Sequence, residues 1–179
     1  MLAYKFLEGG RSPFTGWRWE QPDGLSPAPW LDVSGPLGLC ENGVHACAPR
    51  HLPLWVNDEL WEMELAGEVV ETDVALVASK GRLLGRVQAW GPTMQASFSE
   101  YCAARARQLA SGPSGPSPLV AAIGAMAAGA RAAAAGYWSA VLAGETAAGR
   151  RSGPDYERAF TAERAAQASW LTKELALAG

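Results

Sequence analysis

The first half of the chain alternates apolar and polar residues with the period of two that is typical of β-strands. Strand segments are predicted at residues 2–7, 14–20, 61–65 and 81–90, separated by stretches rich in Gly and Pro. A short helix is predicted between the second and third of them, at residues 48–56. This half of the chain should therefore form a mostly antiparallel, strongly twisted sheet with one short helix.

The period changes after Pro92. Apolar residues recur at helical spacing over residues 93–110, which predicts an amphipathic helix. A run of Ser, Gly and Pro at residues 111–117 has the composition of a flexible linker, and the Ala-rich remainder predicts more helices. The predicted fold class is α+β, an N-terminal mostly antiparallel twisted sheet followed by a C-terminal helical segment. The predicted domains are an α+β domain at 1–110, the linker at 111–117 and a helical extension at 118–179.

Charge and cysteine content narrow the setting. The formal net charge of −3 over 179 residues does not suit nucleic acid or an anionic membrane as the main partner. The most apolar stretch, residues 119–142, is mostly Ala and Gly with Arg131 inside it, which is too weakly apolar for a membrane span. Three cysteines do not make the disulfide framework of a small secreted domain. We expect a cytoplasmic protein that binds neither nucleic acid nor membranes, with a helical tail that is a candidate for homo-oligomerisation.

Residues 37–47 hold the most reactive combination of side chains in the chain. Asn42-Gly43 is the typical sequence of a two-residue type I′ hairpin turn. With that turn, Cys40 lies opposite His45, and opposed residues share one face of the ribbon with Cβ atoms about 4.5–5.5 Å apart. Residues two apart on a strand also share a face. The sequence therefore predicts that Cys40, His45 and Cys47 project from one side of a hairpin.

This predicted Cys/His face has three possible roles, and the sequence leaves all three open. As a catalytic site, His45 is the base, and Cys40, or else Cys47, is the nucleophile. As a metal site, Cys40, His45, Cys47 and His51 supply four ligands for tetrahedral zinc. In the third role, the cysteines are small buried hydrophobes and His45 is a hydrogen-bonded structural residue.

Aromatic and cationic residues around this segment suggest a ligand pocket. The tryptophans that could line it, or that could instead fill the core of the sheet, are Trp17, Trp19, Trp30, Trp55 and Trp61. The arginines that could hold an anion are Arg11, Arg18, Arg50, Arg82 and Arg86. We select Arg11, Trp17, Trp19 and Trp55 as the candidate ligand-binding residues. The predicted function is a small enzyme or small-molecule-binding domain that uses the Cys/His face beside a Trp-rich pocket; the alternative is a structural or interaction module.

Three motifs carry a resemblance to a known family. They are Leu39-Cys-x-x-Gly-Val-His-Ala-Cys47, Leu60-Trp-Glu-Met-Glu-Leu-Ala-Gly-Glu-Val-Val-Glu71 and Val77-Ala-Ser-Lys-Gly-Arg-Leu-Leu84. The chain resembles, over roughly residues 2–90, a family of uncharacterised actinobacterial and phage domains with a Leu-Cys-x-x-Gly-x-His-Ala-Cys signature. The resemblance implies no particular activity.

A more distant similarity is to ADP-ribosyltransferase-like domains, which bind NAD between two small sheets. That similarity rests on the layout of Gly-x-His, a short helix and a strand ending in Gly-Glu-Val. It implies that Arg11 or His45, together with Glu68, would contact NAD.

Overall fold

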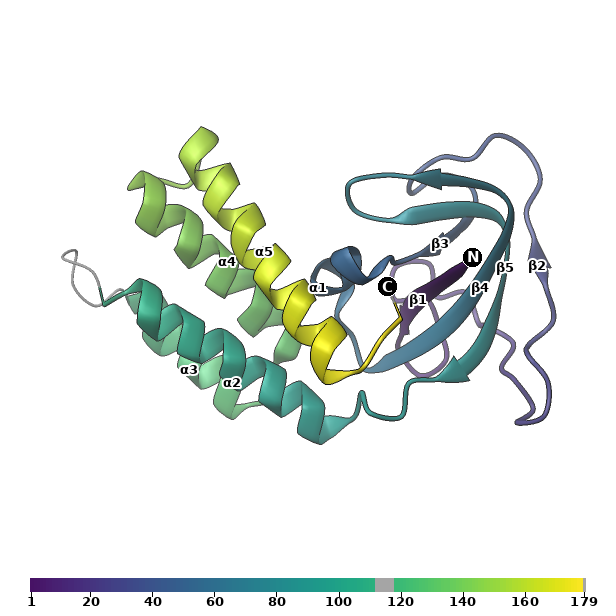
Figure 1. Ribbon diagram of the computed structural model, residues 1–179, viewed down its shortest axis with the longest axis horizontal. Helices are drawn as coiled ribbons and strands as arrows, with labels where there is room; N and C mark the ends of the chain where they lie inside the picture. The colour runs from purple at the N-terminus through teal and green to yellow at the C-terminus, as the bar shows by residue number, and fades with distance from the viewer. Residues whose placement is uncertain (112–117, 179) are drawn as a thin grey trace. The chain divides into compact units, whose positions relative to one another are not determined.

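The protein is described by a computed structural model that covers residues 1–111 and 118–178 (Figure 1). The chain divides into a sheet unit, Met1–Trp90 with the residues from Leu175 onward, and a helical unit, Gly91–Glu174. An N-terminal antiparallel sheet followed by C-terminal helices confirms the predicted α+β class. The strands are β1 (Leu2–Leu7), β2 (Leu31–Asp32), β3 (Val44–Ala46), β4 (Glu59–Glu71) and β5 (Leu76–Arg86). The helices are η1 (Pro49–His51), α1 (Leu52–Trp55), α2 (Pro92–Leu109), α3 (Pro118–Ala128), α4 (Ala132–Ala148) and α5 (Pro154–Glu174).

A long, bent hairpin of β4 and β5 forms the frame of the sheet unit (Figure 1). The strand order is β1-β4-β5-β2, and β3 also pairs with β5. A bridge then joins the end of β3 to β1: Tyr4 N–H donates to the Cys47 carbonyl at 2.8 Å, and Cys47 N–H donates to the Tyr4 carbonyl at 2.6 Å. The pairings β1-β4-β5-β3-β1 therefore form a closed ring, so the short β3 strand has partners on both sides.

One side of this ring is an apolar core. Strict alternation along β4 turns Trp61, Met63 and Leu65 to this side, as the sequence predicts. The other buried residues of this cluster are Ala3, Leu7, Trp19, Ala28, Val44, Ala46, Ala48, Leu76, Ala78 and Leu83. The opposite side of β1 carries Tyr4 and Phe6, and the Phe6 ring packs edge-on against Trp90 at 5.6 Å between centroids.

The sequence predicted some of these elements and missed others. Strand β1 has the predicted bounds, and the short helix falls within the predicted range 48–56. The strand predicted at 14–20 is wrong, because residues 12–17 form a tight turn in which Ser12 N–H donates to the Trp17 carbonyl. Phe14 and Trp17 of this turn are exposed, whereas Trp19, which follows the turn, is buried. The alternation of Trp17 and Trp19 therefore marked neither a strand nor a shared face.

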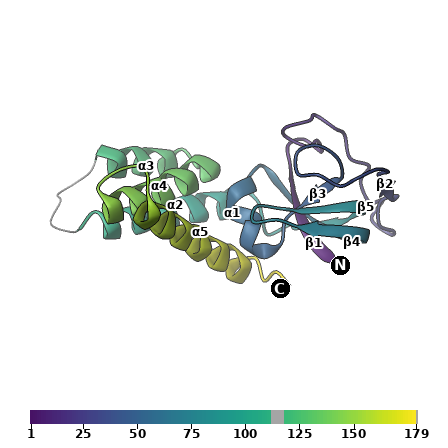
Figure 2. The same cartoon turned by 90° about the horizontal axis from the view of Figure 1, so that it is seen from above.

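The helical unit is built around α4, which lies among α2, α3 and α5 (Figure 2). Most of its buried positions are Ala, Gly or Ser. Helix α2 packs against α3 and α4, and α5 packs against α4. The structure thus groups α2 with the later helices, although the sequence placed it in a domain ending at residue 110. Residues 112–117 of the predicted linker lie outside the described residues.

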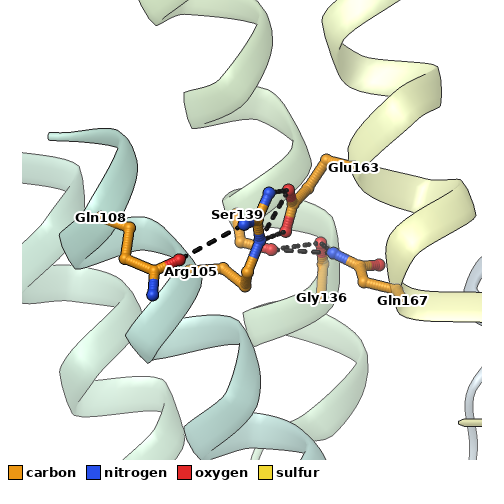
Figure 3. Close-up of polar contacts among 6 residues, drawn as sticks. All are labelled: Arg105, Gln108, Gly136, Ser139, Glu163 and Gln167. Carbon is orange, nitrogen blue, oxygen red and sulfur yellow. Dashed lines mark hydrogen bonds and ion pairs between the residues drawn. The ribbon is translucent and has the colours of Figure 1, made fainter. Parts of the chain in front are cut away.

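Polar side chains connect three helices inside the helical unit (Figure 3). Glu163 of α5 is buried and accepts hydrogen bonds from the Arg105 guanidinium of α2, at 2.8 Å from Nη2 and 3.2 Å from Nε. Gln167 of α5 donates from Nε2 to the Gly136 carbonyl at 2.9 Å and to Ser139 Oγ at 2.8 Å, both on α4. Because an unpaired buried polar group is costly, these bonds favour one register of α2, α4 and α5.

Within residues 1–111 and 118–178, no helix combines the length and the apolar character needed to cross a bilayer.

Two helical glycines allow a matched test of this packing. A Cβ added at Gly144 of α4 would lie 2.4 Å from a ring carbon of Tyr156, whereas one added at Gly124 of α3 would meet nothing within 4 Å. G124A should raise the free energy of unfolding by up to about 1 kcal/mol through helix propensity. G144A should lower it by about 1–3 kcal/mol through overpacking. Thermal unfolding followed by circular dichroism measures both; a stabilising G144A would show that Tyr156 does not pack closely on α4.

Candidate functional site

The turn before β3 differs from the predicted hairpin. Gly38 N–H donates to the Asn42 carbonyl, and the N–H groups of Glu41 and Asn42 donate back to the Gly38 carbonyl. The turn therefore spans residues 38–42, with Cys40 near its tip. The predicted two-residue turn at Asn42-Gly43 is wrong, and so is the predicted pairing of Cys40 with His45 across it.

Two side chains explain why Asn42-Gly43 does not form the expected turn. Asn42 Nδ2 donates to the carbonyls of Ser34 and Pro36, both at 3.0 Å, so its amide ties the turn to the preceding loop. Gly43 has φ of 128°, and a Cβ there would lie 2.5 Å from Val77 Cγ1. The glycine is needed for close approach to β5.

His45 supports the turn through both of its ring nitrogens. Nε2 accepts the backbone N–H of Cys40 at 2.9 Å, which assigns the ring proton to Nδ1. Nδ1 then donates to the Gly43 carbonyl at 3.0 Å. The bond to Cys40 holds a non-glycine residue at φ of 62°, a left-handed conformation that costs about 1–2 kcal/mol. Since both nitrogens bond to the backbone, this geometry does not favour His45 as the base for a thiol.

Cys40 and Cys47 lie in different environments. The Cys40 side chain is exposed on the turn, whereas Cys47 is 4% exposed at the bridge that closes the ring. Burial raises the pKa of the Cys47 thiol to about 12, although the nearby charge of Lys5 lowers it. Cys47 is therefore a neutral thiol at physiological pH, and it fits the packing role better than the nucleophilic one.

Lys5 is a buried cation beside these residues that the sequence did not single out. Its Nζ donates to the His45 carbonyl at 2.6 Å and lies 4.9 Å from the centroid of the Trp19 ring. Burial lowers the pKa of Lys5 to about 8. Alternation along β1 predicts that Lys5 lies on the other face of the strand from Tyr4 and Phe6. Nothing in the sequence indicates that the face with Lys5 is buried as well.

The four predicted zinc ligands are not assembled into a site. Among all described residues, no group of three or more His, Cys, Asp or Glu side chains has a metal-binding arrangement. His51 is buried at the end of η1, where Nδ1 accepts the Ala48 N–H at 3.2 Å. Burial lowers the pKa of His51, and the charge of Arg50 acts in the same direction.

The predicted ligand-binding residues also separate into different roles. Trp19 belongs to the core and donates from Nε1 to Ser12 Oγ, while Trp55 donates to the Val74 carbonyl at 2.6 Å. Trp17, Arg11 and Glu68 are exposed. Arg11 donates to the Gly16 carbonyl at 3.0 Å and so stabilises the 12–17 turn.

An open cavity lies elsewhere on the sheet unit, beside the end of β5. We call it the Trp61 hollow; its lining consists of Pro22, residues 24–27, Trp61, residues 84–86 and Gln88. Its volume of about 410 Å³ is within the range of small-molecule sites, about 300–1,000 Å³. Trp61 and Arg86 are among the tryptophans and arginines noted in the sequence, but no spacing signal paired them.

Strand register places three of the relevant side chains in one row. Lys5 of β1 is directly opposite Trp61 of β4, which is directly opposite Arg86 of β5. Directly opposed residues share a face, so two cationic side chains flank the indole. Glu59 holds this arrangement, because its Oε2 accepts Trp61 Nε1 at 3.1 Å and the Gly10 N–H at 3.3 Å.

The rim of the hollow is ordered by local bonds. Asp23 Oδ1 accepts the N–H groups of Leu25 and Ser26 at 2.9 and 2.8 Å, and Ala28 N–H donates to the Leu83 carbonyl on β5. This loop displays Leu25 with 97% of its surface exposed. Leu25 therefore presents apolar surface at the rim of the hollow.

No family model matches the chain, and no curated protein or solved structure matches it either. The resemblance to uncharacterised actinobacterial and phage domains stays a prediction, as does the ADP-ribosyltransferase-like layout.

The His45 bonds predict a pH dependence of stability. Burial lowers the pKa of His45, and the Lys5 charge lowers it further, against the opposing effect of the Gly43 carbonyl. The unfolded chain takes up this proton near pH 6.5, and the folded chain only at lower pH. Stability should therefore fall as the pH drops below about 6.5.

Urea unfolding at several pH values measures this effect. H45Q should flatten the slope of unfolding free energy between about pH 5 and 7. H51Q is the matched control: it should remove only the contribution of His51, so a slope due to His45 should remain. An unchanged slope in H45Q would contradict the assignment.

Burial also predicts how the three thiols react. Under native conditions an alkylating reagent should modify Cys40 alone, because burial raises the pKa of both Cys47 and Cys102 to about 12. Intact-mass spectrometry should show one rapid addition, lost in C40S and kept in C47S. Equally rapid modification of Cys47 would mean that the closing bridge of the ring is open in solution.

Proposed function

We propose that the sheet unit is a small-molecule-binding domain whose ligand occupies the Trp61 hollow. The observation that carries this proposal is the combination, in one hollow of about 410 Å³, of an indole, a guanidinium and an ordered loop with an exposed leucine. Clefts of this size that combine apolar and aromatic side chains with a few polar groups are common sites of small ligands.

The Cys/His segment supports the hollow indirectly in this proposal. His45 fixes the 38–42 turn, and its carbonyl accepts the hydrogen bond of Lys5. Lys5 in turn lies opposite Trp61 across the β1–β4 pairing. In this proposal, the cysteines and the histidine of the signature do not contact the ligand; they stabilise the part of the sheet unit that carries the hollow.

The state of the cysteines supports a reducing compartment such as the cytoplasm as the protein's location. All three are free thiols, and one of them is exposed.

Fragment screening by NMR tests the binding function directly. A library of neutral, acidic and basic aromatic fragments is added to isotope-labelled protein, and backbone amide shifts locate any binding. We expect the hits to shift the amides of Leu25, Ser26, Gly85 and Gln88. L25S should weaken these hits about 3- to 10-fold, since part of a leucine side chain loses its contact with the ligand.

F14S is the matched control, because Phe14 is also a highly exposed apolar residue but does not line the hollow. It should leave the affinities unchanged. A library that shifts no amide of the hollow, or hits that F14S and L25S weaken equally, would contradict the proposed function.

A further inference from the structure

The charge around the Trp61 hollow indicates which ligands fit it. Arg86 lines the hollow, and its side chain is 39% exposed. Its one ion-pair contact among the described residues is with Glu59, at 3.7 Å between Nη1 and Oε1. That separation is longer than a hydrogen bond, so the guanidinium keeps donors for another acceptor.

Glu59 is not free to move closer to Arg86. Its other carboxylate oxygen accepts the Trp61 indole N–H and the Gly10 N–H, and the side chain is 16% exposed. A rotation toward Arg86 would break these two bonds and leave a largely buried indole N–H without its acceptor. Glu59 therefore orients the indole and lies near the guanidinium without saturating it.

The remaining charges nearby favour an anion. Lys5 flanks Trp61 on the other side, and a pKa of about 8 keeps it mostly protonated at neutral pH. The carboxylate of Asp23 is turned toward the amides of its own loop. The residues paired with Trp61 across the sheet are thus both cationic, Lys5 and Arg86, and one carboxylate, that of Glu59, bonds to the indole.

We propose that the Trp61 hollow selects small aromatic or apolar molecules bearing an oxyanion, either a carboxylate or a phosphate, which Arg86 binds, and that Glu59 is a positioning residue for Trp61 and Arg86. This inference rests on the proposed function of the hollow. A guanidinium suits both oxyanions because its parallel N–H donors match two oxygens of either group.

Three probes of the same aromatic body test the selectivity. Benzoate, phenyl phosphate and the neutral benzamide are titrated separately, with binding followed by the amide shifts of Ser26 and Gln88. At low salt the better of the two anions should bind about five- to tenfold more tightly than benzamide. Added salt should reduce this difference, because the pair is partly exposed. The anion that binds more tightly, benzoate or phenyl phosphate, shows whether the hollow prefers a carboxylate or a phosphate.

Variants separate the roles of the charged residues. R86Q should remove the preference for anions, because it should lower the affinity for the better anion by more than it lowers the affinity for benzamide. R82Q is the matched control, since Arg82 pairs with Glu64 and stacks on Trp30 and does not line the hollow. E59Q keeps an acceptor for Trp61 but loses the charge, so the ratio of anion affinity to benzamide affinity should rise about two- to threefold.

The outcomes for the two proposals are distinct. Equal affinity for benzamide and both anions, or a preference for anions that survives in R86Q, would overturn the oxyanion inference and leave the hollow as a binding site. Benzamide binding that stays unchanged in E59A, which removes the acceptor of the Trp61 indole N–H, would overturn the positioning role. If no probe shifts the amides of the hollow, both the inference and the proposed function fail.

Discussion

The backbone bridge between Tyr4 and Cys47 is the interaction on which the sheet unit depends. Strand β3 is only three residues long, and it pairs with β5 on one side. The bridge supplies its second partner and closes the ring of pairings, which satisfies backbone groups that would otherwise be buried without partners. The same closure brings the His45 carbonyl within reach of Lys5 and so connects the 38–42 turn to the row that contains Trp61.

This arrangement gives a physical meaning to the Cys/His signature. Cys47 packs as a buried thiol at the closing bridge, Gly43 allows close approach to Val77, and His45 holds Cys40 in a left-handed turn. Each residue solves a local problem of packing or hydrogen bonding. A cluster of reactive residue types can therefore indicate a backbone conformation that only a few residue types allow, as well as a catalytic site.

Much of the fold was predictable because its signals are local. Alternation located β1 and the inward side of β4, and helical spacing located α2. The turn at 38–42 was not predictable, since it depends on bonds from Asn42 to residues 34 and 36 and on the pairing of β3 with β5, a strand far along the chain. The Trp61 hollow could not be predicted for the same reason: a row across three strands becomes visible only when the register is known.

The low complexity of the C-terminal sequence follows from the position of α4 among its neighbours. A helix that is contacted on most of its circumference has few positions at which a larger side chain fits, so alanine, glycine and serine recur along it. The repetitive sequence of α4 therefore reflects a steric restriction: the packing limits the size of the side chain at each buried position more strictly than its chemical type. Small side chains alone would let such helices pack in several registers. The few large or polar residues, such as Glu163 and Gln167, select one register through their specific bonds.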